Sequence, residues 1–145
     1  MTDENDSRWD IPAGKRPDFQ TDLKYGKRGE NLVKDFIASL VEGSFEVKSD
    51  RFRNGRMVVE LEQNPRGKGW KPSGLAVCLA TWWVYCFALE GAFVVVSCDR
   101  LKRFVATLPV KRMKTFAPLS NNPTRGYLLE PEEVNLMMCS TEYDA

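Results

Sequence analysis

The sequence contains no histidine among its 145 residues. This absence excludes the Ser-His-Asp and Cys-His catalytic arrangements and every metal site that needs an imidazole ligand. The four cysteines follow no CxxC spacing and three of them lie in apolar runs, which predicts free thiols in a reducing compartment and no structural zinc site. Any enzymatic chemistry therefore depends on carboxylates, lysine, tyrosine or a hard metal ion with oxygen ligands.

The sequence also lacks a long apolar segment. The longest apolar run, from Leu75 to Leu89, is short for a membrane span and lies in the middle of the chain. The first ten residues are polar and acidic, unlike a secretory signal peptide. We therefore expect no membrane partner and a cytoplasmic location.

The formal net charge of +1 conceals an uneven distribution of charge. No acidic side chain occurs between Leu101 and Arg125, and from Glu130 onwards all charged side chains are acidic. A length of 145 residues suits one domain with a substantial core. We divide the chain into a flexible N-terminal arm over residues 1–20, a single domain over residues 21–140 and an acidic tail over residues 141–145.

The hydrophobic pattern predicts both helices and strands. Apolar residues recur at helical spacing between Thr21 and Val41, which indicates an amphipathic helix. Two alternating runs, 44–50 and 56–63, predict strands, and Asn54-Gly55 between them is typical of a β-hairpin turn. The remaining pattern predicts a buried helix over 75–89, a fully buried strand over 92–98, a helix over 99–106, a basic loop over 107–126, a short strand over 127–129 and a terminal helix over 130–138. The order helix-strand-strand-helix-strand-helix predicts an α/β protein with a small mixed α+β sheet.

Carboxylates are concentrated on one face of the predicted hairpin. Asp50 ends the first strand, and Glu60 and Glu62 share a face of the second. Asp50 and Glu60 would then lie opposite each other across the strand pair. Because opposed carboxylates repel, a Mg2+ or Mn2+ ion between them would explain their positions. The alternative is a solvated strand face on which these acids pair with Lys48 and Arg56.

These acids resemble the motif of the PD-(D/E)XK nuclease superfamily, in which an aspartate is followed, across a hairpin, by an acid-x-lysine sequence. Asp50 and the sequence Glu60-Leu61-Glu62 match this pattern, and Glu30 matches a recurrent extra ligand in the preceding helix. The stretches FEVKSD, NG, VELE and GKGWKPSG look like those of phage-encoded endonucleases that resemble Holliday-junction resolvases. The resemblance covers about residues 26–105 and implies a restriction-endonuclease-like core.

The sequence departs from the superfamily pattern at one position, because Glu62 stands where lysine is usual. The resemblance implies a site for Mg2+ or Mn2+ formed by four carboxylates, Glu30, Asp50, Glu60 and Glu62. Catalytic roles then fall to Asp50, Glu60, Glu62 and Lys48. Glu62 would serve as a further ligand or as the base, and Lys48 would supply the positive charge. Alternatively, Lys48 forms only a salt bridge.

Polar and basic side chains in two segments are candidates for contacts with DNA phosphates. They are Arg66, Lys68, Lys71 and Ser73 in a glycine-rich loop, and Lys111, Arg112 and Lys114 in the basic segment. The alternative is that both segments only keep the protein soluble. Trp70 is a further candidate contact residue in the loop, whereas at least one of Trp82 and Trp83 is expected in the core.

The sequence therefore predicts a metal-dependent endodeoxyribonuclease that hydrolyses phosphodiester bonds in DNA, with branched or junction DNA as a candidate substrate. Because sites that cut both strands usually have two-fold symmetry, we expect a homodimer. For a phage-encoded protein the location would be the cytoplasm of the bacterial host. A non-catalytic nucleic-acid-binding or regulatory protein on the same fold is the alternative, and a small structural protein is the third reading. A pure DNA-binding protein gains nothing from acids beside phosphates, which favours the nuclease.

Overall fold

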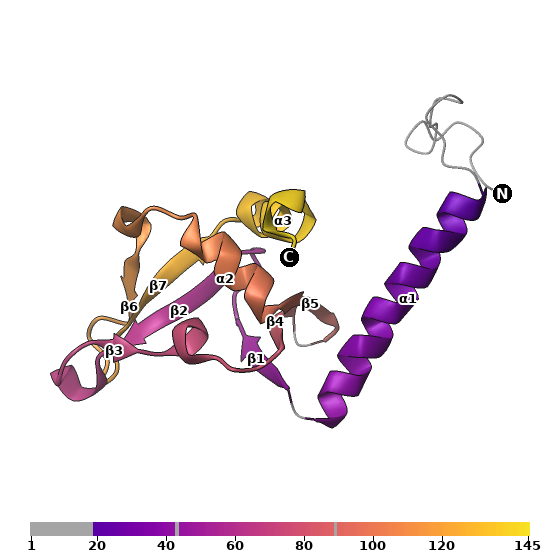
Figure 1. Ribbon diagram of the computed structural model, residues 1–145. Helices are drawn as coiled ribbons and strands as arrows, with labels where there is room; N and C mark the ends of the chain where they lie inside the picture. Colours follow the sequence, from indigo (N-terminus) through magenta and orange to yellow (C-terminus); the bar gives the residue numbers. More distant parts are fainter. Residues whose placement is uncertain (1–18, 43, 89) are drawn as a thin grey trace. The chain divides into compact units, whose positions relative to one another are not determined.

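The structure is a computed structural model that describes residues 19–42, 44–88 and 90–145. Within these ranges the chain forms three α-helices and two sheets, one of them mixed (Figure 1), so the predicted α+β class with a mixed sheet is confirmed. The helices are α1 (Phe19–Val41), α2 (Cys98–Ala106) and α3 (Pro131–Cys139). None of the described helices combines the length and the apolar character that a membrane span requires.

The chain divides into two compact units, Met1–Ala38 and Ser39–Ala145. The described part of the first unit consists of α1, and the amphipathic helix predicted over 21–41 is confirmed there. Its apolar residues Leu32, Val33 and Ile37 are exposed. The predicted arm over 1–20 lies outside the described residues except for its last two positions.

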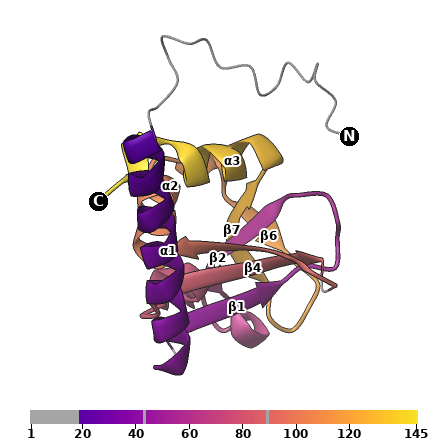
Figure 2. The ribbon, with the colours of Figure 1, turned by 90° about the vertical axis from the view of Figure 1, so that its right-hand side faces the viewer.

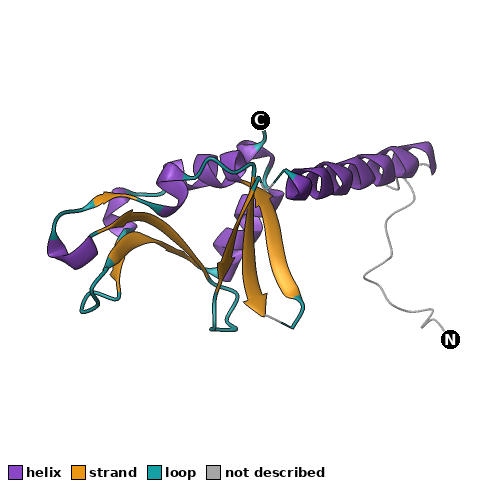
Figure 3. Cartoon of the chain, turned by 90° about the horizontal axis from the view of Figure 1, so that it is seen from below, coloured by secondary structure: helices purple, strands orange, loops and turns teal. Residues whose placement is uncertain are grey.

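The second unit contains both sheets, which are separate layers in Figure 3. The first sheet has the order β1-β4-β5, with β1 parallel to β4 (Figure 2) and β4 antiparallel to β5. The second sheet is antiparallel throughout and has the order β3-β2-β7-β6. The strands of the first sheet are β1 (Phe45–Ser49), β4 (Trp82–Ala88) and β5 (Ala92–Ser97). Those of the second are β2 (Met57–Gln63), β3 (Lys71–Pro72), β6 (Lys114–Phe116) and β7 (Thr124–Leu129).

The predicted hairpin between 44–50 and 56–63 is wrong. Both strands form, as β1 and β2, but β1 pairs with β4 whereas β2 pairs with β3 and β7. The turn at Asn54-Gly55 does exist, because Asn54 Oδ1 accepts a hydrogen bond from the amide of Arg56 at 3.0 Å and Gly55 has a φ of 73°. It leads the chain from one sheet into the other. Asp50 and Glu60 are therefore not cross-strand neighbours.

The predicted buried helix over 75–89 is also wrong. Only Gly74–Val77 forms a turn of 3-10 helix, and Trp82–Ala88 forms β4. Three successive residues of β4, Trp83, Val84 and Tyr85, are buried. Burial on both faces removes the two-residue alternation by which a strand is distinguished from a helix. Five strands therefore lie between α1 and α2, where the sequence predicted three strands and a helix.

Two smaller predictions need correction, and three are confirmed. The strand over 92–98 forms as β5, but it is not fully buried, because the side chain of Phe93 is 59% exposed. The basic loop over 107–126 contains β6 and the beginning of β7. The helix over 99–106 forms as α2, the strand over 127–129 as the end of β7, and the terminal helix as α3.

One core cluster joins the two sheets to α2 and α3. Inward-facing side chains of the first sheet, such as Trp83, and of the second sheet, such as Met57, belong to it together with Phe104 of α2. The end of the chain also packs here, because Tyr143 lies edge-to-face on Phe104 with ring centroids 5.1 Å apart, and Arg100 pairs with Asp144 at 2.6 Å. The acidic tail predicted over 141–145 is therefore anchored to the core.

Candidate functional site

Asp50 directly follows β1 and links the first sheet to the second. Its amide donates to the carbonyl of Cys86 at 3.0 Å, which continues the pairing of β1 with β4. Its Oδ1 accepts from the amide of Phe52 at 2.7 Å, and its Oδ2 accepts from the hydroxyl of Tyr85 at 2.9 Å. The same hydroxyl accepts from the amide of Val58, in β2, at 3.1 Å. The carboxylate is thus held in one orientation at the carboxyl end of β1.

Tyr85 is the buried residue that makes this link. Burial raises the pKa of Tyr85 to about 12, the hydrogen bond from Val58 opposes the shift, and the hydrogen bond and charge of Asp50 add to it. The hydroxyl therefore keeps its proton at neutral pH. It donates that proton to Asp50 while its oxygen accepts from Val58.

Glu60 lies on β2, two residues after Val58, in a region where two other segments approach closely. A Cβ atom at Gly74 would lie 2.3 Å from the carbonyl oxygen of Glu60, and one at Gly126 would lie 1.9 Å from the carbonyl oxygen of Val59. Real Cβ atoms do not come so close to a backbone oxygen. Glycine is therefore required at both positions for β7 and the turn after Ser73 to pack against this part of β2.

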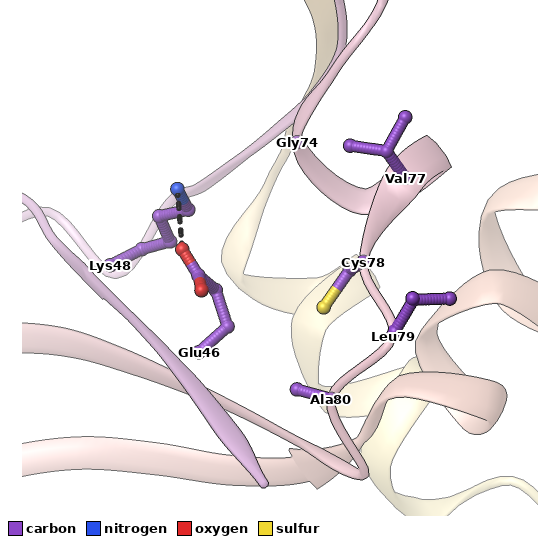
Figure 4. A pocket seen from close by; sticks show the side chains of 7 residues that line it. All are labelled: Glu46, Lys48, Gly74, Val77, Cys78, Leu79 and Ala80. Atoms are coloured by element: carbon purple, nitrogen blue, oxygen red, sulfur yellow. Dashed lines mark ion pairs between the residues drawn. The ribbon is translucent and has the colours of Figure 1, made fainter. Parts of the chain in front are cut away.

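Lys48 lies beside a pocket of about 340 Å³ between β1 and the segment Gly74–Ala80 (Figure 4). Its Nζ pairs with Glu46 Oε1 at 3.0 Å and lies 5.7 Å from the ring centroid of Trp83. The structure therefore shows the salt bridge that was the alternative reading for Lys48, with Glu46 as the partner. Because Gly74 lines the same pocket and packs on Glu60, this pair lies near that part of β2.

Glu62 has a different environment from Asp50. It follows a register shift in the pairing of β2 with β7. Its Oε2 lies 3.6 Å from Nη1 of Arg125, and the guanidinium carbon of Arg125 lies 3.7 Å from the ring centroid of Trp70. Arg125 is therefore in contact with an acid and with an aromatic ring.

The three predicted metal ligands of the second unit, Asp50, Glu60 and Glu62, do not form a metal-binding group in the described structure. Glu30 is an exposed residue of α1 and belongs to the first unit. Among residues 19–42, 44–88 and 90–145, no three Asp, Glu or Cys side chains lie close enough together to hold a metal ion.

The donor chemistry of Asp50 and Glu60 nevertheless fits Mg2+ or Mn2+. Mg2+ is usually bound by one or two carboxylates, and substrate phosphates and water complete its shell. A carboxylate has about four lone-pair positions, so Asp50 can still coordinate an ion while it accepts from Phe52 and Tyr85. Such outer hydrogen bonds orient a metal-binding carboxylate.

The predicted DNA contacts fall into three groups. Arg66, Lys68, Lys71, Lys111 and Lys114 are exposed. Arg112 instead forms an ion pair with both carboxylate oxygens of Glu133 and donates to the carbonyl of Leu128. This pairing lowers the pKa of the Glu133 carboxyl and raises the pKa of Arg112. Ser73 is only 4% exposed, so its hydroxyl does not face solvent as a phosphate contact would require.

The sequence reasoning missed two residues of the arrangements described above: Tyr85, which holds Asp50, and Arg125, which contacts Trp70. Tyr85 lay inside a segment interpreted as a helix, which hid its place beside Lys48 in the sheet register. A correct strand assignment for 82–88 would have put its side chain on the inner face with Trp83. The pairing of Arg125 with Glu62 depends on the register of β2 and β7, for which the sequence contains no signal.

The chain was compared with protein-family models, with curated proteins and with solved structures, and no match was found in any of the three comparisons. Cys78, Cys86, Cys98 and Cys139 are free cysteines in this structure.

Proposed function

We propose that the chain is a metal-dependent endodeoxyribonuclease of the PD-(D/E)XK kind, built on a restriction-endonuclease-like core and acting in the cytoplasm, which for a phage-encoded protein is that of the bacterial host. One observation carries the proposal. Asp50 is fixed at the carboxyl end of a strand by Tyr85, and the same hydroxyl binds β2 two residues before Glu60. Asp50 is the aspartate of the motif and Glu60 is its first acid. The Tyr85 hydroxyl joins the two segments that carry them.

The residues take the following roles in this proposal. Asp50 and Glu60 hold Mg2+ or Mn2+, and Tyr85 keeps the Asp50 carboxylate oriented. When bound, such an ion supplies an activated water molecule and neutralises phosphate charge. Lys48, beside the pocket, attracts a phosphate of the substrate once Glu46 releases it. Glu30 and Glu62 stay proposed as additional ligands on the strength of the resemblance, and a homodimer stays the expected assembly.

A second candidate function is a nucleic-acid-binding or regulatory protein without catalytic activity. Glu62 stands at the position where the superfamily has its lysine, and its ion pair with Arg125 favours this candidate. The candidate is favoured also by the lack of a three-acid group in the part of the chain that the structure describes. This candidate predicts DNA binding without cleavage.

The test is a cleavage assay on labelled duplex DNA and a labelled four-way junction, each with Mg2+, with Mn2+ and with EDTA. The chain is compared with Asp50→Asn, which keeps the size of the side chain and an oxygen that accepts from Tyr85. Asp99→Asn is the matched control, because Asp99 is an exposed acid on α2.

Cleavage that requires the metal, is lost in Asp50→Asn and persists in Asp99→Asn supports the nuclease. Cleavage confined to the junction makes branched DNA the substrate. Binding of both DNAs without cleavage in either metal, unchanged in Asp50→Asn, supports the second candidate and refutes the nuclease.

A further inference from the structure

The loop between β2 and β3 presents an aromatic ring together with basic side chains. We name the group of Trp70, Arg125, Lys68 and Lys71 the Trp70 platform. The guanidinium of Arg125 lies against the Trp70 ring, with its central carbon 3.7 Å from the ring centroid. Glu62 pairs with the same guanidinium at 3.6 Å, which helps to hold it in this position. The ring is therefore supported by Arg125 and is not free to rotate as a lone loop side chain would be.

The backbone of the loop is also held in place. Asn64 accepts at its Oδ1 from the amide of Gly69 at 2.8 Å, and its own amide donates to the carbonyl of Pro123 at 2.9 Å. The amide of Arg66 donates to the carbonyl of Asn121 at 2.6 Å. Gly69 has a φ of 128°, which a residue with a side chain rarely adopts. Because these contacts order the loop in advance, a ligand that binds Trp70 does not incur that ordering cost.

A pocket of about 340 Å³ adjoins the ring. It is lined by Pro65, Lys68, Gly69, Trp70 and Lys71, so its lining includes one aromatic residue and two lysines and no acid. Lys68 and Lys71 are exposed. A flat ring joined to a negative charge suits such a pocket, and an unpaired nucleotide combines the two. A base inside a duplex cannot reach the ring, because its faces are covered by its neighbours.

We propose that the Trp70 platform binds an unpaired DNA base by stacking, with Lys68 and Lys71 on the adjacent phosphates. This inference rests on the proposed function, because it names the substrate class of the same DNA-acting protein. The chain then prefers DNA that exposes unpaired bases, such as single strands, overhangs and branch points, over a plain duplex. Base stacking of this kind tolerates any sequence, since every base has an aromatic face.

The test measures dissociation constants by fluorescence anisotropy for three labelled DNAs: a single strand, its duplex, and the duplex with a single-stranded overhang. EDTA is present so that no cleavage occurs, and the salt concentration is kept constant, because phosphate contacts depend on it. The variants are Trp70→Ala and Trp70→Phe. Phe93→Ala is the matched control, because Phe93 is an exposed aromatic residue of the first sheet.

We expect Trp70→Ala to weaken binding of the single strand and the overhang by about tenfold or more. Duplex binding should change by less than about threefold, since the lysines remain. Trp70→Phe should recover most of the affinity, and Phe93→Ala should bind as the unchanged chain does. Circular dichroism of each variant checks that the fold is retained.

Equal binding of the single strand by Trp70→Ala and the unchanged chain would overturn the stacking site. An equal loss of affinity for single strand and duplex would also overturn it, because it would show a general effect on phosphate contacts. Neither result bears on cleavage, which is tested through Asp50. If the unchanged chain binds none of the three DNAs, both this inference and the proposed function fail.

Discussion

The two sheets of this protein differ in what their outer faces carry. In the second sheet, Met57, Val59 and Leu129 point inward and are completely buried, whereas Glu60 and Glu62 occupy the other face of β2. In β4 and β5 of the first sheet both faces are apolar: Trp83 and Tyr85 are buried on the inner face, and Phe93 is 59% exposed on the outer one. The charged residues of this sheet, Glu46 and Lys48, lie on β1. The central strand β2 of the second sheet thus alternates between apolar and polar residues, and the central strand β4 of the first sheet does not.

The proposed site draws different residues from the two sheets. The outer face of the second sheet carries Glu60, Glu62 and Arg125, and the first sheet contributes Glu46 and Lys48 on β1 and Asp50 where β1 ends. Tyr85 is the side chain that reaches from the first sheet to the backbone of the second. The proposed site therefore depends on the second sheet for its polar face and on the first for its support. The predictions below test these two dependencies.

The largest effect is expected from Gly126→Ala in the second sheet. The new methyl group would lie 1.9 Å from the carbonyl oxygen of Val59, so β7 must move away from β2. We expect the free energy of unfolding in urea to fall by about 3 kcal/mol, the upper end of the usual cost of overpacking. Gly26→Ala on α1 is the control, because a Cβ there meets nothing within 4 Å. An unchanged urea midpoint for Gly126→Ala would contradict the close packing described for β2.

Tyr85→Phe tests the link between the sheets. It removes the acceptor of the Val58 amide and the donor to Asp50 while leaving the ring in the core. We expect a loss of about 1–3 kcal/mol in the free energy of unfolding, because the partly buried amide of Val58 loses its partner. Tyr143→Phe, which keeps its ring against Phe104, is the matched control. If the two variants are equally stable, the hydroxyl of Tyr85 does not join the sheets.

The same residue predicts a dependence of stability on alkaline pH. The folded protein keeps the phenol proton up to a pKa of about 12, whereas the unfolded chain releases it at the ordinary tyrosine pKa of 10.0. Tyr85 therefore contributes its full stabilisation below pH 10, and the contribution falls as the pH rises from 10 towards 12. The measurement is the free energy of unfolding against pH for the unchanged chain and Tyr85→Phe. Parallel curves above pH 10 would refute the raised pKa.

A smaller effect is expected where the basic segment meets α3. Arg112→Ala breaks the pair with Glu133, and we expect a loss of about 1 kcal/mol, since both side chains are partly exposed. The pair lowers the pKa of Glu133, so its stabilisation is present above the ordinary carboxyl pKa and is lost as the pH falls through the lowered one. Urea unfolding at neutral and acidic pH measures both effects.

Lys111→Ala is the control for Arg112→Ala, because Lys111 is exposed in the same segment. It should leave the stability unchanged and weaken binding to DNA, as expected for a phosphate contact. If Arg112→Ala is as stable as Lys111→Ala, the ion pair with Glu133 has no structural role.

The smallest effect concerns thiol reactivity beside the first sheet. Cys98 is buried, and its sulfur lies 3.7 Å from that of Cys78. Burial is the main cause that raises the pKa of Cys98 to about 12, and the hydrogen bond with the Cys78 thiol is the second. Cys139 is exposed. At neutral pH iodoacetamide should therefore modify Cys139 first and Cys98 last, because the thiolate is the reactive form. Mass spectrometry of a time course measures the order, and equal rates for the two thiols would contradict it.

The parts of the fold that depend on local pattern could be predicted from the sequence. Alternation in 57–63 identified β2 correctly, and helical spacing identified α1 and α2. The partner of β2 could not be predicted, because Met57 pairs with Leu129, which is distant in sequence. A sequence that ends a strand at Asp50 and turns at Asn54-Gly55 looks the same whether the chain enters a hairpin or crosses to another sheet.

The candidate site was predictable to a similar extent. Asp50 and Trp70 were selected from residue type and spacing, and the structure shows the side chains that hold them, Tyr85 and Arg125. The role of Arg112 was not predictable, because its charge matches a phosphate contact as well as it matches the carboxylate of Glu133. Tyr85 was hidden by the apolar run around it, where burial on both faces makes a strand resemble a buried helix.

The most direct test of the central claim is the initial rate of duplex or junction cleavage with Mg2+, measured for the unchanged chain and for Asp50→Asn under identical conditions. The account predicts metal-dependent cleavage by the unchanged chain and loss of that cleavage in Asp50→Asn, with both proteins folded. Cleavage at the same rate by Asp50→Asn, or no cleavage by the unchanged chain on either DNA, would contradict the assignment of a nuclease site at Asp50.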